Sequence, residues 1–142
     1  MSAARTPRTD GPAGGHTEHP TISMRELGSN TLHLAVSGEI DAATAPEVLT
    51  GIESRLRGYH QLVLDLSHVD FFSTAGYSAL HRLQVYCSRA AIDWVLIAGR
   101  EVRRLLRICD PDGLLPTADN IVSAVATLAR GPHRTPQLRL LR

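Results

Sequence analysis

The fold is decided by residues 63–83, which read VLDLSHVDFFSTAGYSALHRL. The start of this stretch continues an apolar run that is typical of a strand buried in a sheet, and its end has the apolar spacing of a helix. Two hydroxyl residues, Ser73 and Thr74, lie where that helix must begin. The first N–H groups of a helix lack partners within it and lie at the positive end of its dipole. This position therefore suits an anion or an added phosphate group.

Alternating strand and helix patterns extend from this stretch in both directions. Runs of apolar and β-branched residues predict strands at 22–27, 31–37, 61–66, 93–98 and 114–116. Apolar residues at helical spacing predict helices within 44–58, 73–87, 100–109 and 119–129. The resulting order, ββαβαβαβα, predicts a single α/β domain. Its mixed, mostly parallel sheet of about five strands has helices packed against it.

Several residues predict how these elements begin, end and face the core. Thr44 and Glu47 have the spacing of a capping box at the start of the first helix. Pro116 restricts the last strand to a sheet edge, because proline cannot donate a hydrogen bond to a neighbouring strand. Asp119 is predicted to cap the last helix. The residues of that helix expected to face inward are Ile121, Val125, Leu128 and Ala129.

Composition and charge narrow the class of protein. The chain has 142 residues and a net charge of +1, so neither nucleic acid nor an anionic membrane is expected as a partner. Cys87 and Cys109 belong to no redox or metal-binding motif, and we expect reduced thiols. No apolar run approaches the roughly 20 residues that span a bilayer, and no apolar signal-peptide segment begins the chain. These features predict a cytoplasmic protein.

The two ends of the chain differ in composition from the middle. Residues 1–20 are rich in Pro, Gly and polar groups, which predicts a disordered N-terminal arm. Residues 131–142 begin with Gly-Pro, a helix-ending pair, and are expected to form a mobile C-terminal tail. Residues 21–130 therefore constitute the predicted domain.

Three parts of this domain carry a family resemblance. Residues 38–47 read GEIDAATAPE, and residues 64–76 read LDLSHVDFFSTAG. A third part combines WVLIA at 94–98, VRRLL at 102–106 and GLL at 113–115. Together these stretches resemble the STAS domain, the fold of bacterial anti-sigma factor antagonists, also called anti-anti-sigma factors. The first two motifs are specific in combination, and the resemblance covers the whole predicted domain.

The resemblance implies a modification site. In that family the loop after the third strand reads Asp-Ser-Ser-Gly-Leu, and a partner that is both kinase and anti-sigma factor phosphorylates the first serine. Here Ser73 takes the Asp position and Thr74 the phosphorylated serine, followed by Ala75, Gly76 and Tyr77. The resemblance therefore implies phosphorylation at Thr74, with Ser73 as the alternative. It also places all five residues on a partner-binding surface. The acceptor hydroxyl is kept, whereas the preceding carboxylate is not.

The function implied is that of a non-catalytic transcription regulator without a cofactor. It would bind an anti-sigma factor of the GHKL kinase type and thereby release a sigma factor, in a partner-switching mechanism. A phosphate adds about −1.5 to −2 charge, which is costly when sealed into an interface, so the phosphorylated form is expected to dissociate. By resemblance Glu39 and Asp41 would flank the same surface. A helix-capping role for Asp41 and a merely solvated Glu39 are the alternatives.

Other interpretations stay open beside this one. The domain could instead be a STAS subunit of a sensor assembly or of a transporter accessory complex, acting without phosphorylation. An enzyme is not favoured, because Ser67, His68 and Asp70 are crowded in sequence without a Gly-x-Ser-x-Gly elbow, and a surface turn is predicted there. The histidines lack metal-binding spacing, so no metal site is expected. An arginine stripe at residues 100–107 is either a solvated helix face or a partner contact.

Overall fold

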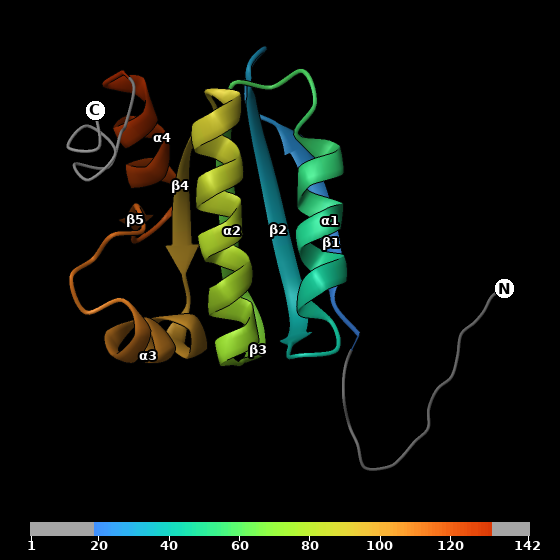
Figure 1. The fold of residues 1–142 in the computed structure, drawn as a ribbon. Helices are drawn as coiled ribbons and strands as arrows, with labels where there is room; N and C mark the ends of the chain where they lie inside the picture. The colour runs from blue at the N-terminus through green and yellow to red at the C-terminus, as the bar shows by residue number, and fades with distance from the viewer. Residues whose placement is uncertain (1–18, 132–142) are drawn as a thin grey trace, which may run out of the picture.

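The structure is a computed structural model that describes residues 19–131, so the predicted arm and tail lie almost entirely outside the described residues and remain predictions. Nine elements follow in the expected order (Figure 1). They are β1 (Thr21–Glu26), β2 (Thr31–Ile40), α1 (Ala45–Arg55), β3 (Gln61–Phe72), α2 (Thr74–Ala90), β4 (Asp93–Ala98), α3 (Arg100–Cys109), β5 (Thr117–Ala118) and α4 (Ile121–Ala129).

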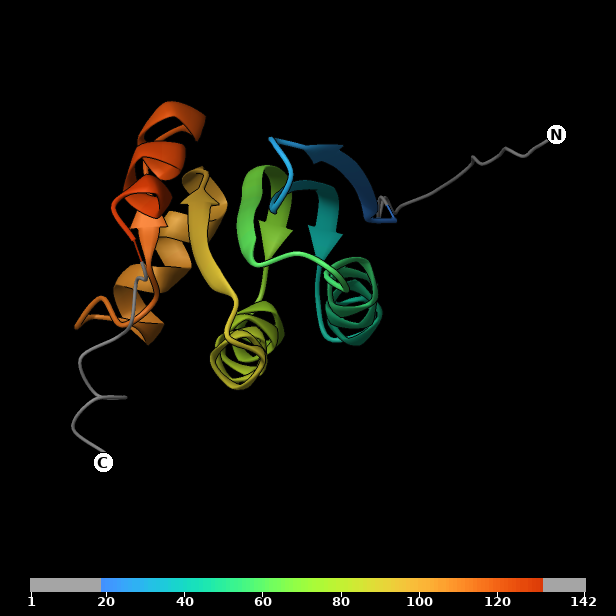
Figure 2. The ribbon, with the colours of Figure 1, turned by 90° about the horizontal axis from the view of Figure 1, so that it is seen from above.

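The five strands form one mixed sheet in sequence order, β1-β2-β3-β4-β5. The pair β1–β2 is antiparallel, and the other three pairs are parallel. Helices α1 and α2 lie on the same face of the sheet when the molecule is viewed from above (Figure 2). The predicted fold class is therefore confirmed. Because β2, β3 and β4 run in parallel, the loops that lead into α1, α2 and α3 all leave the same end of the sheet.

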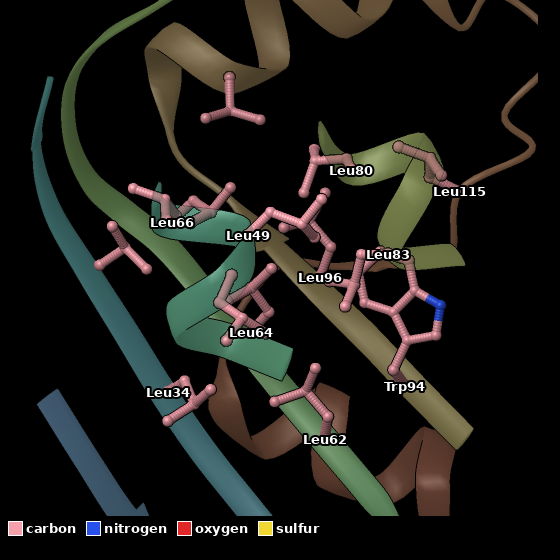
Figure 3. Packing of buried hydrophobic residues seen from close by; sticks show 14 of the residues in the cluster. Leu34, Leu49, Leu62, Leu64, Leu66, Leu80, Leu83, Trp94, Leu96 and Leu115 are labelled. Atoms are coloured by element: carbon pink, nitrogen blue, oxygen red, sulfur yellow. The ribbon is translucent and has the colours of Figure 1, made fainter. Parts of the chain in front are cut away.

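The two faces of the central strands carry two separate hydrophobic clusters, as the period-two alternation of a strand requires. On the face covered by α1 and α2, residues such as Leu64 and Leu96 pack among the side chains shown in Figure 3. On the opposite face Val63 and Val95 pack against Leu128 of α4. Both faces of β3 and β4 are therefore buried, which accounts for their nearly continuous apolar sequence.

Strand β3 is longer than predicted. It continues beyond Leu66 to Phe72, because His68, Val69, Phe71 and Phe72 pair with residues 37–40 of β2, with one register shift before this segment and another within it. Ser67, His68 and Asp70 are exposed, as expected of a surface segment, but the predicted turn is wrong, since the segment is strand. The extension carries the chain to the start of α2 and so determines where Ser73 lies.

The last strand and the last helix begin later than predicted. The strand at 114–116 is wrong: β5 is Thr117–Ala118, and Pro116 contributes its carbonyl, which accepts a hydrogen bond of 2.8 Å from the Leu96 N–H. Asp119 does not cap α4. Asn120 does, because its side chain accepts a hydrogen bond of 2.8 Å from the Ser123 N–H in a capping box.

The helix phase of α4 shifts with its start. Ala124 and Leu128 are its buried residues, whereas Val125 and Ala129, which were expected to face inward, are exposed. In residues 31–37 the apolar Leu32, Leu34 and Val36 alternate with His33 and Ala35, which predicts a strand covered mainly on one face, and this prediction is wrong for His33. This imidazole is buried, and its Nε2 lies 3.5 Å from Oδ2 of the buried Asp65.

Two further predictions concern the cysteines and membrane insertion. Both cysteines are free, and burial raises the pKa of the Cys87 thiol to about 12, which leaves it protonated and unreactive. Cys109 is only partly buried. Within residues 19–131, no helix combines the length and the apolar character that crossing a bilayer demands.

Candidate partner-binding site

The candidate site is built where β2 and β3 end side by side. Ile40 and Phe72, the last residues of the two strands, are register partners in the parallel ladder. One residue further on, the Ser73 N–H donates a hydrogen bond of 3.0 Å to the Ile40 carbonyl. This bond joins the loop before α2 to the loop before α1. Sequence segments more than 30 residues apart thus form one surface at the end of the sheet.

Helix α2 begins with a cap and then an unused hydroxyl. Ser73 is the N-cap residue, with extended backbone, and its side-chain oxygen accepts a hydrogen bond of 3.2 Å from the Ala75 N–H. Thr74 follows as the first helical residue and is exposed. Its side chain makes no hydrogen bond to any residue between 19 and 131. Thr74 therefore presents a free hydroxyl at the positive end of the α2 dipole.

The next three residues are partly or fully buried. Ala75 and Tyr77 are half-buried, and Gly76 is buried. A Cβ atom on Gly76 would lie 2.5 Å from Cε1 of Phe72, so glycine is needed for the ring to pack beneath the helix. Burial raises the pKa of the Tyr77 hydroxyl, and the nearby Asp110 and Cys109 raise it further. Gly76 shapes the surface without being accessible on it.

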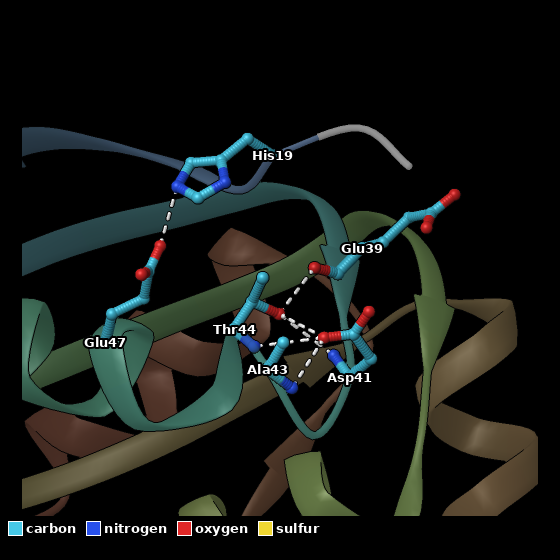
Figure 4. Close-up of polar contacts among 6 residues, drawn as sticks. All are labelled: His19, Glu39, Asp41, Ala43, Thr44 and Glu47. Carbon is cyan, nitrogen blue, oxygen red and sulfur yellow. Dashed lines mark hydrogen bonds and ion pairs between the residues drawn. The ribbon is translucent and has the colours of Figure 1, made fainter. Parts of the chain in front are cut away.

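The turn before α1 uses its polar groups internally (Figure 4). Oδ1 of Asp41 accepts hydrogen bonds from the N–H groups of Ala43 (2.9 Å) and Thr44 (3.0 Å). The Thr44 hydroxyl accepts from the Asp41 N–H at 3.0 Å and lies 3.0 Å from the Glu39 carbonyl oxygen. The predicted capping box of Thr44 and Glu47 is wrong, because the Thr44 side chain makes no cap hydrogen bond to its own helix.

The two acidic residues expected beside the site differ in role. Asp41 organises the turn, and the hydrogen bond from the Thr44 N–H is the main reason why its pKa lies below the ordinary value. The Glu39 carboxylate points away from this turn (Figure 4). Glu39 is the register partner of Phe71, whose side chain is 47% exposed. Sequence reasoning missed Phe71, because register shifts between β2 and β3 interrupt the alternation of β3 past Leu66 and the sequence does not reveal them.

The crowded polar residues of β3 do not form a catalytic triad. The Ser67 hydroxyl lies 2.6 Å from Asp65 Oδ1 and 3.4 Å from His68 Nδ1, so the carboxylate, not the imidazole, contacts the hydroxyl most closely. In a triad the imidazole must take the hydroxyl proton and be oriented by the carboxylate. In residues 19–131 no group of three side chains is arranged to hold a metal ion.

Comparisons with known proteins agree with this fold. Residues 21–124 match the STAS domain. The chain is similar to osmosensory protein A of Mycobacterium tuberculosis, with 34% identity over 116 residues that cover 76% of this chain and 73% of that one.

Two solved structures share the fold at low sequence identity. An anti-sigma factor antagonist from Mycobacterium paratuberculosis superposes with a TM-score of 0.62 at 23% identity, covering 78% of this chain and 94% of that one. The anti-sigma factor antagonist SpoIIAA in its unphosphorylated form superposes with a TM-score of 0.63 at 11% identity, covering 80% and 100%.

Proposed function

We propose, from the premise that this chain belongs to the STAS domain family, that it is an anti-sigma factor antagonist controlled by phosphorylation of Thr74. Its partner is an anti-sigma factor of the GHKL kinase type, and binding of that partner releases a sigma factor. The fold is that of the anti-sigma factor antagonists, and this family consists of non-enzymatic regulators. The proposed binding surface comprises Glu39, Asp41, Ser73, Thr74, Ala75 and Tyr77, and the buried Gly76 shapes it from beneath.

The observation that carries this proposal is the exposed Thr74 hydroxyl on the first turn of α2. A kinase needs an acceptor hydroxyl that can enter its active site. Thr74 is exposed, and no residue between 19 and 131 forms a hydrogen bond with its hydroxyl. A structural neighbour, SpoIIAA, is known in an unphosphorylated form, which agrees with a regulator of this type.

Hydrogen bonding also favours Thr74 over Ser73 as the acceptor. The Ser73 oxygen caps the helix through the Ala75 N–H and is only partly exposed. Phosphorylation there would require loss or rearrangement of the cap, whereas phosphorylation of Thr74 would leave it intact. Ser and Asp are both preferred N-cap residues, so Ser73 performs the capping role of the family aspartate without its charge.

The switch follows from where the added charge would lie. A phosphate on Thr74 carries about −1.5 to −2 charge, and the N-terminus of α2 tolerates it through the positive end of its dipole. Asp41, on the adjoining loop, is ionised because its pKa lies below the ordinary value, so the phosphate would join a negative charge already present there. A partner surface complementary to the neutral hydroxyl would meet this charge without compensation, at a cost of several kcal/mol, or about 10²-fold or more in affinity.

The first test is to incubate the chain with a GHKL-type anti-sigma factor and ATP and to locate the phosphate by mass spectrometry. Phosphorylation is expected on Thr74 and should disappear in Thr74→Ala while persisting in Ser73→Ala. Phosphate on Ser73 in the unchanged protein would contradict the assignment of the acceptor.

Binding of the same anti-sigma factor tests the switch itself. Thr74→Ala should bind within about threefold of the unchanged protein, and Thr74→Glu should lose about 10²-fold. Ser88→Glu is the matched control, because it adds the same charge at an exposed position of α2, about 21 Å further along the helix. Equal affinity of the Thr74→Glu and Thr74→Ala variants would eliminate the proposed switch.

A second candidate function is a STAS subunit of a sensor assembly that acts without phosphorylation. It is favoured by the similarity to a protein named for osmosensing and by the absence of a carboxylate at position 73. In that case copurification should yield sensor or transporter components, and neither substitution at Thr74 should alter their binding.

A further inference from the structure

A recess of about 500 Å³ lies beside α3, and no residue of its lining belongs to the candidate partner-binding site. Its lining includes the buried side chains of Ala98, Leu106 and Leu115, which provide apolar surface. Arg103 and Arg107 line it from α3, and Thr117 lines it from β5. A recess of this volume, with apolar walls and a few polar groups, has the size and character of small-molecule sites.

The two arginines are not used by the rest of the described structure. They are four residues apart on α3, so they project from the same side of the helix, and both are exposed. Neither forms an ion pair within residues 19–131. Their neighbour Arg104, in contrast, has its Nη2 atom 3.2 Å from Glu101 Oε2. The recess therefore holds two guanidinium groups whose donors are available to an incoming anion.

The recess also contains two acidic residues, Asp110 and Asp119, and neither forms an ion pair with Arg103 or Arg107. Both carboxylate oxygens of the buried Asp110 accept backbone hydrogen bonds, from Leu114 N–H at 2.9 Å and Leu115 N–H at 3.0 Å. Asp110 thereby holds the loop that closes one side of the recess, with Gly113 at a positive φ of 67°. Asp119, also on the lining, is exposed to solvent and forms no ion pair within the described residues. The two carboxylates offset the formal charge of the two arginines, but both guanidinium groups are left without an ion pair in the described residues and can donate hydrogen bonds to a ligand.

We propose that this recess binds a small organic anion. Its phosphate or carboxylate head lies between Arg103 and Arg107, and its apolar body lies against Leu106 and Leu115. The recess lies at the carboxyl end of β4, since Ala98 is the last residue of that strand. The proposal does not depend on Thr74 or on the identity of a protein partner.

Titration of the full-length, isotope-labelled chain with phenyl phosphate, followed by NMR, tests the proposal. Saturable shifts are expected at the amides of residues 98, 106, 107, 113 and 115, with half-saturation at or below about 1 mM. Inorganic phosphate should bind at least about tenfold more weakly, because it lacks the apolar body. Benzoate in place of phenyl phosphate distinguishes a carboxylate from a phosphate as the preferred head group.

Paired variants show whether the two arginines of the recess are responsible. Arg103→Gln with Arg107→Gln should weaken phenyl phosphate binding by at least about tenfold. Arg100→Gln with Arg104→Gln is the matched control, since it removes the same charge from the same helix outside the recess, and it should change binding by less than about threefold.

Three results would overturn the proposal. One is equal weakening by both pairs of substitutions, which would mean attraction to the general charge of α3. Another is the absence of saturable shifts up to about 10 mM ligand. The third is a shift of the same amides with protein concentration alone, which would mean that a second copy of the chain occupies the recess.

Discussion

The two β–α junctions at the end of the sheet use threonine in opposite ways. Before α1, Thr44 is 6% exposed, and its hydroxyl is bonded to the Asp41 N–H and lies beside the Glu39 carbonyl. At the start of α2, Thr74 is exposed, and its hydroxyl has no partner in the described part of the chain. A hydroxyl near a helix start is therefore structural where the preceding loop binds it and available for modification where that loop does not.

The largest effect on stability is expected for Thr44→Val. The substitution keeps the shape of the side chain but leaves the Asp41 N–H without its acceptor, which should lower the free energy of unfolding by about 2 kcal/mol. Urea denaturation followed by circular dichroism measures this change. A loss below about 0.5 kcal/mol would show that the turn does not need this hydroxyl.

A smaller effect is expected for Ser73→Ala, which removes the cap of α2. The Ala75 N–H loses its acceptor, and the free energy of unfolding should fall by about 1 kcal/mol. Ser73→Asp is the control, because aspartate caps equally well and its charge is favourable at a helix N-terminus, so it should be at least as stable as the unchanged protein. If both variants lose the same stability, Ser73 does not act as a cap.

Thr74→Val should change the free energy of unfolding by no more than about 0.5 kcal/mol, because the exposed hydroxyl has no hydrogen bond to lose. The same denaturation experiment, run beside Thr44→Val, compares the two junctions with one identical substitution. Similar losses in the two variants would contradict the distinction between a structural and an available threonine.

The smallest effect is expected from titration of Asp41, whose carboxylate is open to solvent. Its pKa is lowered below the usual 3.8, so ionised Asp41 stabilises the folded state above that value. This stability is lost as the pH falls through the lower pKa of the folded state. Asp41→Asn should therefore show a shallower fall in stability between about pH 5 and pH 2.

A second carboxylate, Asp65, also contributes to the pH dependence of stability. Burial alone would raise the pKa of Asp65, but hydrogen bonds from Ser67 and His33 together lower it below the ordinary value. Asp65 therefore adds acid sensitivity in the same direction as Asp41. Asp65 is present in both proteins, and the difference between them reports Asp41 alone. Identical pH profiles for the two proteins would show that Asp41 contributes no linkage.

Much of the fold could be predicted because its signals are local. Near-continuous apolar runs predict β3 and β4, and helical spacing predicts α2 with Gly76, Leu80, Leu83 and Cys87 inward, as the structure shows. The exposed Ser67, His68 and Asp70 broke the apolar pattern, so the far half of β3 was missed. That half is a strand because it pairs with β2, and no single segment of sequence records such pairing.

The sequence by itself determined the order of the elements, the apolar faces that drive their packing, and the presence of two hydroxyl residues at the start of α2. Only the tertiary structure decided which hydroxyls are free. It joined Ser73 to Ile40 at the end of β2, buried Thr44 in a turn and left Thr74 exposed. The physical reason is that burial, and the hydrogen bond from Ser73 to Ile40, depend on chain segments that meet only after the parallel strands have aligned.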